Sequence, residues 1–120
     1  MASYTAVALT LSFATGCSSD TIDVEAQPFF FSHLADDKII METGRAYRRA
    51  NRDEDDKNRL KELLLANNSL TGEANYKAIQ DILVNKVNSD FKTGRINTVN
   101  GWVLSLTEVR QCALFSILHS

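Results

Sequence analysis

The fold of this 120-residue chain is decided by one stretch near its C-terminus, Val99-Asn100-Gly101-Trp102-Val103-Leu104-Ser105-Leu106-Thr107-Glu108-Val109. Asn100-Gly101 predicts a two-residue type I′ turn, because both positions of that turn need positive φ angles. Ser105 and Glu108 have the spacing of a capping box, in which each side chain accepts a hydrogen bond from the backbone N–H of the other residue. The stretch therefore predicts a β-hairpin that leads directly into a helix.

The helix that follows, expected over residues 106–119, is predicted to be the central element of the fold. Leu104 and Val109 have the spacing of a hydrophobic staple, which would fix the angle at which the chain enters the helix. Apolar residues are spread around most of the helix circumference: Leu106, Val109, Cys112, Ala113, Leu114, Phe115, Ile117 and Leu118. A helix that is apolar on nearly all sides is buried, so we expect the other helices to pack around it.

Three further helices are predicted upstream, over residues 36–51, 54–66 and 74–92, with Asp36 or Ser32 as the first N-cap and Asp53 as the second. Gly44 lies inside the first of them, which suggests a close helix–helix approach at that point. The third is expected to bury a stripe of apolar residues: Tyr76, Ile79, Ile82, Leu83, Val87 and Phe91. The predicted fold is mainly α, a small four-helix domain with one short β-hairpin (96–99 and 102–104) before the last helix.

Composition and charge restrict the class of protein. A hydrophobic content of 44%, a charged content of 23% and a net charge of −2 are typical of one globular domain. The slightly acidic balance gives no reason to expect nucleic acid as a partner. No window is apolar over the roughly 18 residues that a membrane-spanning helix needs.

The N-terminal stretch has the pattern of a targeting signal. Residues 4–17 contain no charged side chain and end in Ala14-Thr15-Gly16-Cys17, which resembles the lipobox signal of bacterial lipoproteins. This resemblance implies that residues 1–16 are a signal peptide and that Cys17 is lipidated. It also implies that residues 17–27 form a flexible tether to a single helical domain over 28–120. The alternative is that residues 3–14 form a buried first helix or strand, with Cys17 as an inert core thiol.

The sequence contains no convincing metal, cofactor or catalytic site. Asn51, Asp53, Asp55 and Glu62 have EF-hand spacing, but Asp56 occupies the sixth position, where the loop needs glycine. An acidic first turn of a helix explains the same residues. His33 and His119 have no ligand-spaced partners, and Cys112 is interpreted as a small core residue. A disulfide between Cys17 and Cys112 requires that Cys17 is not lipidated.

Two groups of residues are candidates for an interaction surface. Arg45, Arg48, Arg49 and Arg52 form a basic stripe along the first predicted helix, which could contact lipid phosphates, nucleic acid or an acidic partner. The favoured interpretation is local salt bridges with the acidic residues that follow. Trp102 is expected to anchor the hairpin on the helices, and the aromatic run at 29–31 to cover one end of the core.

These observations predict a non-enzymatic lipoprotein, held by Cys17 at a bacterial envelope membrane and facing the periplasm, that acts as an accessory or assembly subunit for a protein partner. One alternative is a binding module whose aromatic residues line a pocket for a small ligand. Another is the small subunit of an exported oxidoreductase complex. For the lipoprotein, neither a cofactor nor a nucleic-acid partner is expected.

Overall fold

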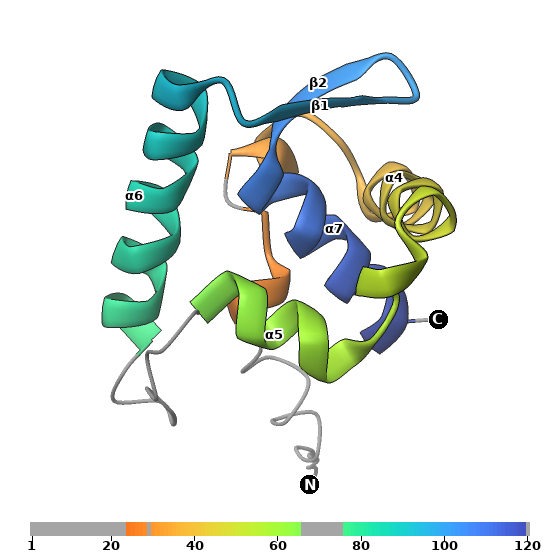
Figure 1. The fold of residues 1–120 in the computed structure, drawn as a ribbon, viewed down its shortest axis with the longest axis horizontal. Coiled ribbons are helices and arrows are strands. Elements are labelled where there is room, and N and C mark those ends of the chain that lie inside the picture. Colours follow the sequence, from red (N-terminus) through yellow and green to blue (C-terminus); the bar gives the residue numbers. More distant parts are fainter. Residues whose placement is uncertain (1–23, 29, 66–75, 120) are drawn as a thin grey trace, which may run out of the picture.

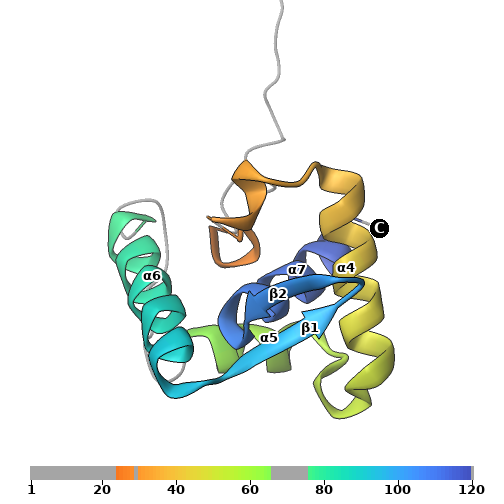
Figure 2. The same ribbon diagram turned by 90° about the horizontal axis from the view of Figure 1, so that it is seen from above.

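The structure, a computed structural model, describes residues 24–28, 30–65 and 76–119, and in it one helix is surrounded by the others (Figure 1). This central helix is α7 (Leu106–Leu118). Around it lie α4 (Asp37–Ala50), α5 (Lys57–Leu65) and α6 (Tyr76–Thr93). Helices α4 and α6 lie on opposite sides of α7 in both views (Figures 1 and 2). The predicted four-helix architecture and the central position of the last helix are thus confirmed.

Short elements complete the described part of the chain. Three 3-10 turns, η2 (Val24–Ala26), η3 (Phe31–His33) and η4 (Arg52–Glu54), connect or precede the helices. Strands β1 (Ile96–Val99) and β2 (Trp102–Ser105) form a two-stranded antiparallel hairpin directly before α7. The predicted helical domain with one hairpin is therefore the observed fold.

The hairpin and its junction with α7 follow the sequence signals closely. Asn100 (φ 51°) and Gly101 (φ 87°) both have the positive φ that a type I′ turn requires. The register pairs Val99 with Trp102. Ser105 ends β2 and caps α7: its Oγ accepts a hydrogen bond from Glu108 N at 3.0 Å, and Ser105 N donates to Glu108 Oε1 at 3.4 Å. The capping box is confirmed, and it joins strand to helix without a loop.

The start of the second helix differs from the prediction. Asp36 caps α4 as expected, since its Oδ1 accepts from Ile39 N at 3.0 Å. Helix α5, however, begins at Lys57 rather than at residue 54, and Asp56 accepts from Arg59 N at 2.8 Å, in the position predicted for Asp53. The reason is that the preceding residues form η4, which directs the Glu54 side chain toward α7. The predicted end at residue 66 lies outside the described residues.

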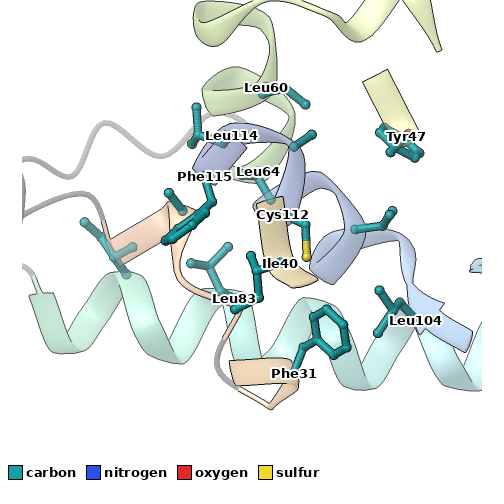
Figure 3. Packing of buried hydrophobic residues seen from close by; sticks show 14 residues of the cluster. Phe31, Ile40, Tyr47, Leu60, Leu64, Leu83, Leu104, Cys112, Leu114 and Phe115 are labelled. Carbon is teal, nitrogen blue, oxygen red and sulfur yellow. The ribbon is translucent and has the colours of Figure 1, made fainter. Parts of the chain in front are cut away.

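The core is formed by the residues of α7 and those that face them (Figure 3). Val109, Cys112, Ala113 and Leu114 are completely buried. They are packed by residues from the three other helices: Ile40, Tyr47, Leu60, Leu64, Ile79 and Leu83. At the α4–α7 contact, a Cβ on Gly44 would overlap the carbonyl oxygen of Cys112. The close approach predicted at Gly44 is confirmed.

The apolar stripe of α6 is buried only in its middle. Ile79, Leu83 and Val87 are buried, whereas Tyr76 and Phe91 are each 49% exposed, so their predicted burial is wrong. An 18-residue helix is about 27 Å long and the 13-residue α7 about 20 Å, so the ends of α6 extend past its packing partner. Gly94, with φ 77°, ends the helix in the left-handed conformation as predicted.

Candidate functional site

An apolar groove is the most distinctive surface feature of the described part of the chain. It has a volume of about 340 Å³ and lies between η3, the C-terminal half of α6 and the hairpin. We call it the aromatic groove and define it by its lining residues: Phe30, Phe31, Leu34, Val87, Asn88, Phe91, Trp102, Val103, Leu104 and Glu108. Of the six exposed large apolar side chains in the described ranges, four line this groove, namely Phe30, Leu34, Phe91 and Val103.

Aromatic contacts between distant segments form one wall of the groove. The rings of Phe31 and Trp102 meet edge to face, with centroids 4.9 Å apart and an angle of 74° between the planes. Phe31 is 1% exposed, so it covers the end of the core as predicted, and Trp102 is half-buried against it. Phe30 remains 41% exposed, which contradicts the expectation that the aromatic run folds entirely onto the core. Phe29 lies outside the described residues.

A buried carboxyl group lies at the base of the groove. Glu108 is 3% exposed and holds the capping box. Burial raises the pKa of this carboxyl, hydrogen bonds from Ser105 and from the Phe31 backbone oppose the rise, and the nearby Asp90 charge adds to it. Asp90, itself 4% exposed, accepts a hydrogen bond from Thr107 N at 2.7 Å and so provides a second cap for α7. Two acids thus meet at the N-terminus of the central helix, where its dipole favours negative charge.

Asp90 was missed by sequence reasoning. A signal was present, because Asp90 follows Leu83 and Val87 at the spacing of the buried stripe of α6. A charged residue at a buried position needs a partner, and Arg95 Nε supplies one at 3.1 Å from Asp90 Oδ1.

A second polar network connects α4, η4 and α7. Arg110 donates two hydrogen bonds to the Glu54 carboxylate, at 2.9 and 3.0 Å, and Tyr47 donates its hydroxyl to the same group at 2.9 Å. Burial alone would raise the pKa of Glu54, but the hydrogen bonds from Arg110 and Tyr47 and the charge on Arg110 outweigh it and lower that pKa. Burial and the neighbouring carboxylate raise the pKa of Tyr47 to about 12. No spacing rule links these residues, because Glu54 and Arg110 are 56 positions apart.

The four predicted surface arginines lie together on α4 and η4, around an open cavity of about 490 Å³. Arg48 forms an ion pair with Asp55 at 2.7 Å. Arg45, Arg49 and Arg52 are exposed and form no ion pair within the described ranges. The expectation of local salt bridges is met for one of the four arginines.

The remaining sequence candidates lie apart from these surfaces or outside the described residues. Cys17, the predicted lipidation site, lies outside them, as do the signal peptide and most of the tether. Cys112 is a free, fully buried thiol whose pKa is raised chiefly by burial. Two of the four residues with EF-hand spacing have other partners: Asp55 pairs with Arg48, and Glu62 pairs with Arg59. In residues 24–28, 30–65 and 76–119 no group of three His, Cys, Asp or Glu side chains could hold a metal ion.

Comparisons with known proteins do not identify a relative of this chain. No protein-family model, no curated protein and no solved structure matches the chain. Within the described ranges, no helix has both the length and the apolar character needed to cross a membrane.

Proposed function

We propose that this chain is a non-enzymatic lipoprotein of the bacterial cell envelope, anchored through Cys17 and facing the periplasm, that acts as an accessory subunit by binding another protein. The anchor is supported by the resemblance of Ala14-Thr15-Gly16-Cys17 to a lipobox. The binding role rests on the aromatic groove, which collects most of the exposed large apolar side chains of the described residues in one place.

The exposed apolar side chains of the groove lie next to one another, and this arrangement indicates a binding site. Single exposed apolar residues are ordinary on protein surfaces, whereas a contiguous patch of them is typical of a binding site. Leu34 is 73% exposed and Val103 is 57% exposed, so part of the patch is available to a partner without any rearrangement. The edge-to-face pair of Phe31 and Trp102 fixes the wall against which a partner side chain would pack. A few residues usually carry most of the free energy of protein–protein association, and tryptophan is enriched among them, so Trp102 is the expected anchor of this surface.

The experiment is affinity purification of the chain from its native membrane, with matched variants. Leu34→Ser with Phe91→Ser removes two exposed groove residues. The control, Tyr76→Ser with Ile96→Ser, removes two side chains of similar exposure (49% and 47%) that do not line the groove. The groove variant should recover about tenfold less partner than the wild type, and the control should recover as much. Equal recovery by both variants would show that the groove is not the binding surface.

The anchor is tested separately. Wild-type protein expressed in cells should incorporate labelled palmitate, and the Cys17→Ala variant should not. Mass spectrometry that finds an intact, unmodified stretch from Met1 to Cys17 in the mature protein would contradict the lipoprotein part of the proposal. Co-purification of a flavin-containing dehydrogenase would identify the partner as the catalytic chain of an exported oxidoreductase.

A second candidate function, a small-ligand binding module, is favoured by the volume of the groove. A volume of about 340 Å³ falls in the range of small-molecule pockets, and its lining is mostly apolar. Native mass spectrometry of protein purified from its own envelope distinguishes the two functions. A retained small apolar molecule that is lost in the Leu34→Ser, Phe91→Ser variant would favour the ligand module over the accessory subunit.

A further inference from the structure

The four arginines on α4 and η4 form a concave, strongly basic surface. Arg45, Arg48, Arg49 and Arg52 surround the cavity of about 490 Å³, and Asp55 is the one acidic residue in its lining. We call this feature the arginine cavity. Four guanidinium groups and one carboxylate leave an excess of three positive charges around it.

None of the nearby acidic residues that the structure describes forms an ion pair with Arg45, Arg49 or Arg52. Glu54 is held by Arg110 and Tyr47, and Asp56 caps α5 through Arg59 N. Asp55 has one arginine, Arg48, as its partner. Glu42 and Asp53, which are close in sequence to Arg45 and Arg52, are exposed. Their carboxylates form no ion pair with any described residue. The structure therefore leaves Arg45, Arg49 and Arg52 available to an external anion.

Arg48 gives the cavity a fixed base. Its Nε contacts Asp55 Oδ1 at 2.7 Å, and its Nη1 donates to Ser116 Oγ at 3.1 Å. Ser116 is fully buried on α7 and donates its own proton to Ala113 O at 2.7 Å. The Arg48 guanidinium is thereby oriented by the central helix before any ligand arrives, which reduces the entropy lost on binding.

A second pocket shows how different the arginine cavity is. Lys86, Arg95 and Arg110 line a pocket of about 290 Å³ between α6 and α7. Each of these cations already has a partner: Lys86 donates to Leu63 O at 3.0 Å, while Arg95 and Arg110 pair with Asp90 and Glu54. Burial lowers the pKa of Lys86 as well. The cations of that pocket are therefore all hydrogen-bonded or ion-paired within the fold. Three arginines of the arginine cavity form no ion pair with a described residue.

We propose that the arginine cavity is a binding site for a phosphate-type oxyanion. Guanidinium groups match phosphate oxygens with two parallel N–H donors, and their planar fork makes arginine the usual residue for such recognition. Arg45 and Arg49 are four positions apart and share one face of α4, and Arg52, at the start of η4, lines the same cavity. All three can therefore reach one multiply charged group. Either a free phosphate or the headgroup of an anionic phospholipid supplies this chemistry.

The test measures both sources with one set of variants. The chain carries Cys17→Ala in every sample, so that no acyl chain contributes to binding. Arg45→Gln with Arg49→Gln removes two charges from the cavity, and both side chains are exposed, so the fold is retained. The control, Lys77→Gln with Lys92→Gln, removes two exposed charges from α6. Calorimetry with inorganic phosphate is the first arm, and sedimentation with phosphatidylcholine vesicles, with or without phosphatidylglycerol, is the second.

Loss of binding in the arginine variant alone supports the site. Phosphate binding should weaken about tenfold or more, or binding to phosphatidylglycerol vesicles should weaken about fivefold for each arginine removed. The arm that responds identifies the source of the oxyanion. The proposal is overturned if the Cys17→Ala protein with all four arginines binds neither probe, or if the lysine control loses as much binding as the arginine variant.

Discussion

Substitution of Gly44 by alanine is the sharpest probe of the packing around α7. Alanine is the better helix former, so at an exposed position this change would stabilise the protein by up to about 1 kcal/mol. Here a methyl group would overlap the Cys112 carbonyl oxygen and lie 2.5 Å from its carbonyl carbon and 2.9 Å from Ala113 N. Ordinary contacts of this kind are near 3.5 Å, and all three atoms belong to the backbone of a helix that cannot adjust locally.

The two helices must therefore separate, and the contacts between α4 and α7 are lost in part. Overpacking in a rigid core costs roughly 1–3 kcal/mol or more. With backbone on the facing side we expect the upper end of that range, about 3 kcal/mol, offset by about 1 kcal/mol from the helix propensity of alanine. The net loss of about 2 kcal/mol corresponds to a decrease in Tm of roughly 8–16 °C for a domain of this size.

Urea denaturation followed by circular dichroism measures this loss. Lys38→Ala, an exposed substitution on the same helix, is the control and should change the free energy of unfolding by less than about 0.5 kcal/mol. A Gly44→Ala protein that is as stable as the wild type, or more stable, would refute the close approach of α4 to α7.

Three further predictions concern polar groups. Glu54→Gln should cost about 2 kcal/mol at neutral pH, because it weakens the hydrogen bonds from Arg110 and Tyr47. The pKa of Glu54 lies below its ordinary 4.5 in the folded state, so this difference in unfolding free energy should be complete above pH 4.5 and shrink as the pH falls further; urea titrations across that range measure it. Ser105→Ala should lower the free energy of unfolding by about 1–2 kcal/mol through loss of the cap, measured in the same way, and an unchanged value would argue against the capping box. Glu108→Gln should gain stability relative to the wild type as the pH rises above 4.5, because the folded protein holds the Glu108 proton more tightly than the unfolded chain does; a difference in denaturation midpoints that is independent of pH would contradict this.

Sequence reasoning succeeded where interactions are local. The hairpin turn at Asn100, the capping box of Ser105 and the glycine that ends α6 involve groups within about five residues of one another, and all were predicted. The prediction was wrong at the start of α5, where residues 52–54 form η4 and Glu54 accepts hydrogen bonds from Arg110, a residue far along the chain. For the candidate sites, the sequence identified the four arginines as a group. It did not show that only one of them, Arg48, forms an ion pair with a described acidic residue.

The sequence by itself determined which segments become helix and hairpin and which helix lies at the centre. These properties follow from turn geometry, capping and apolar periodicity, which act between near neighbours. Only the tertiary structure decided that Phe91 and Val103 remain exposed beside Phe31 and Trp102, and that Arg48 reaches Ser116 on α7. The physical reason is that such contacts depend on where helices of unequal length cross and end, and no local interaction specifies those positions.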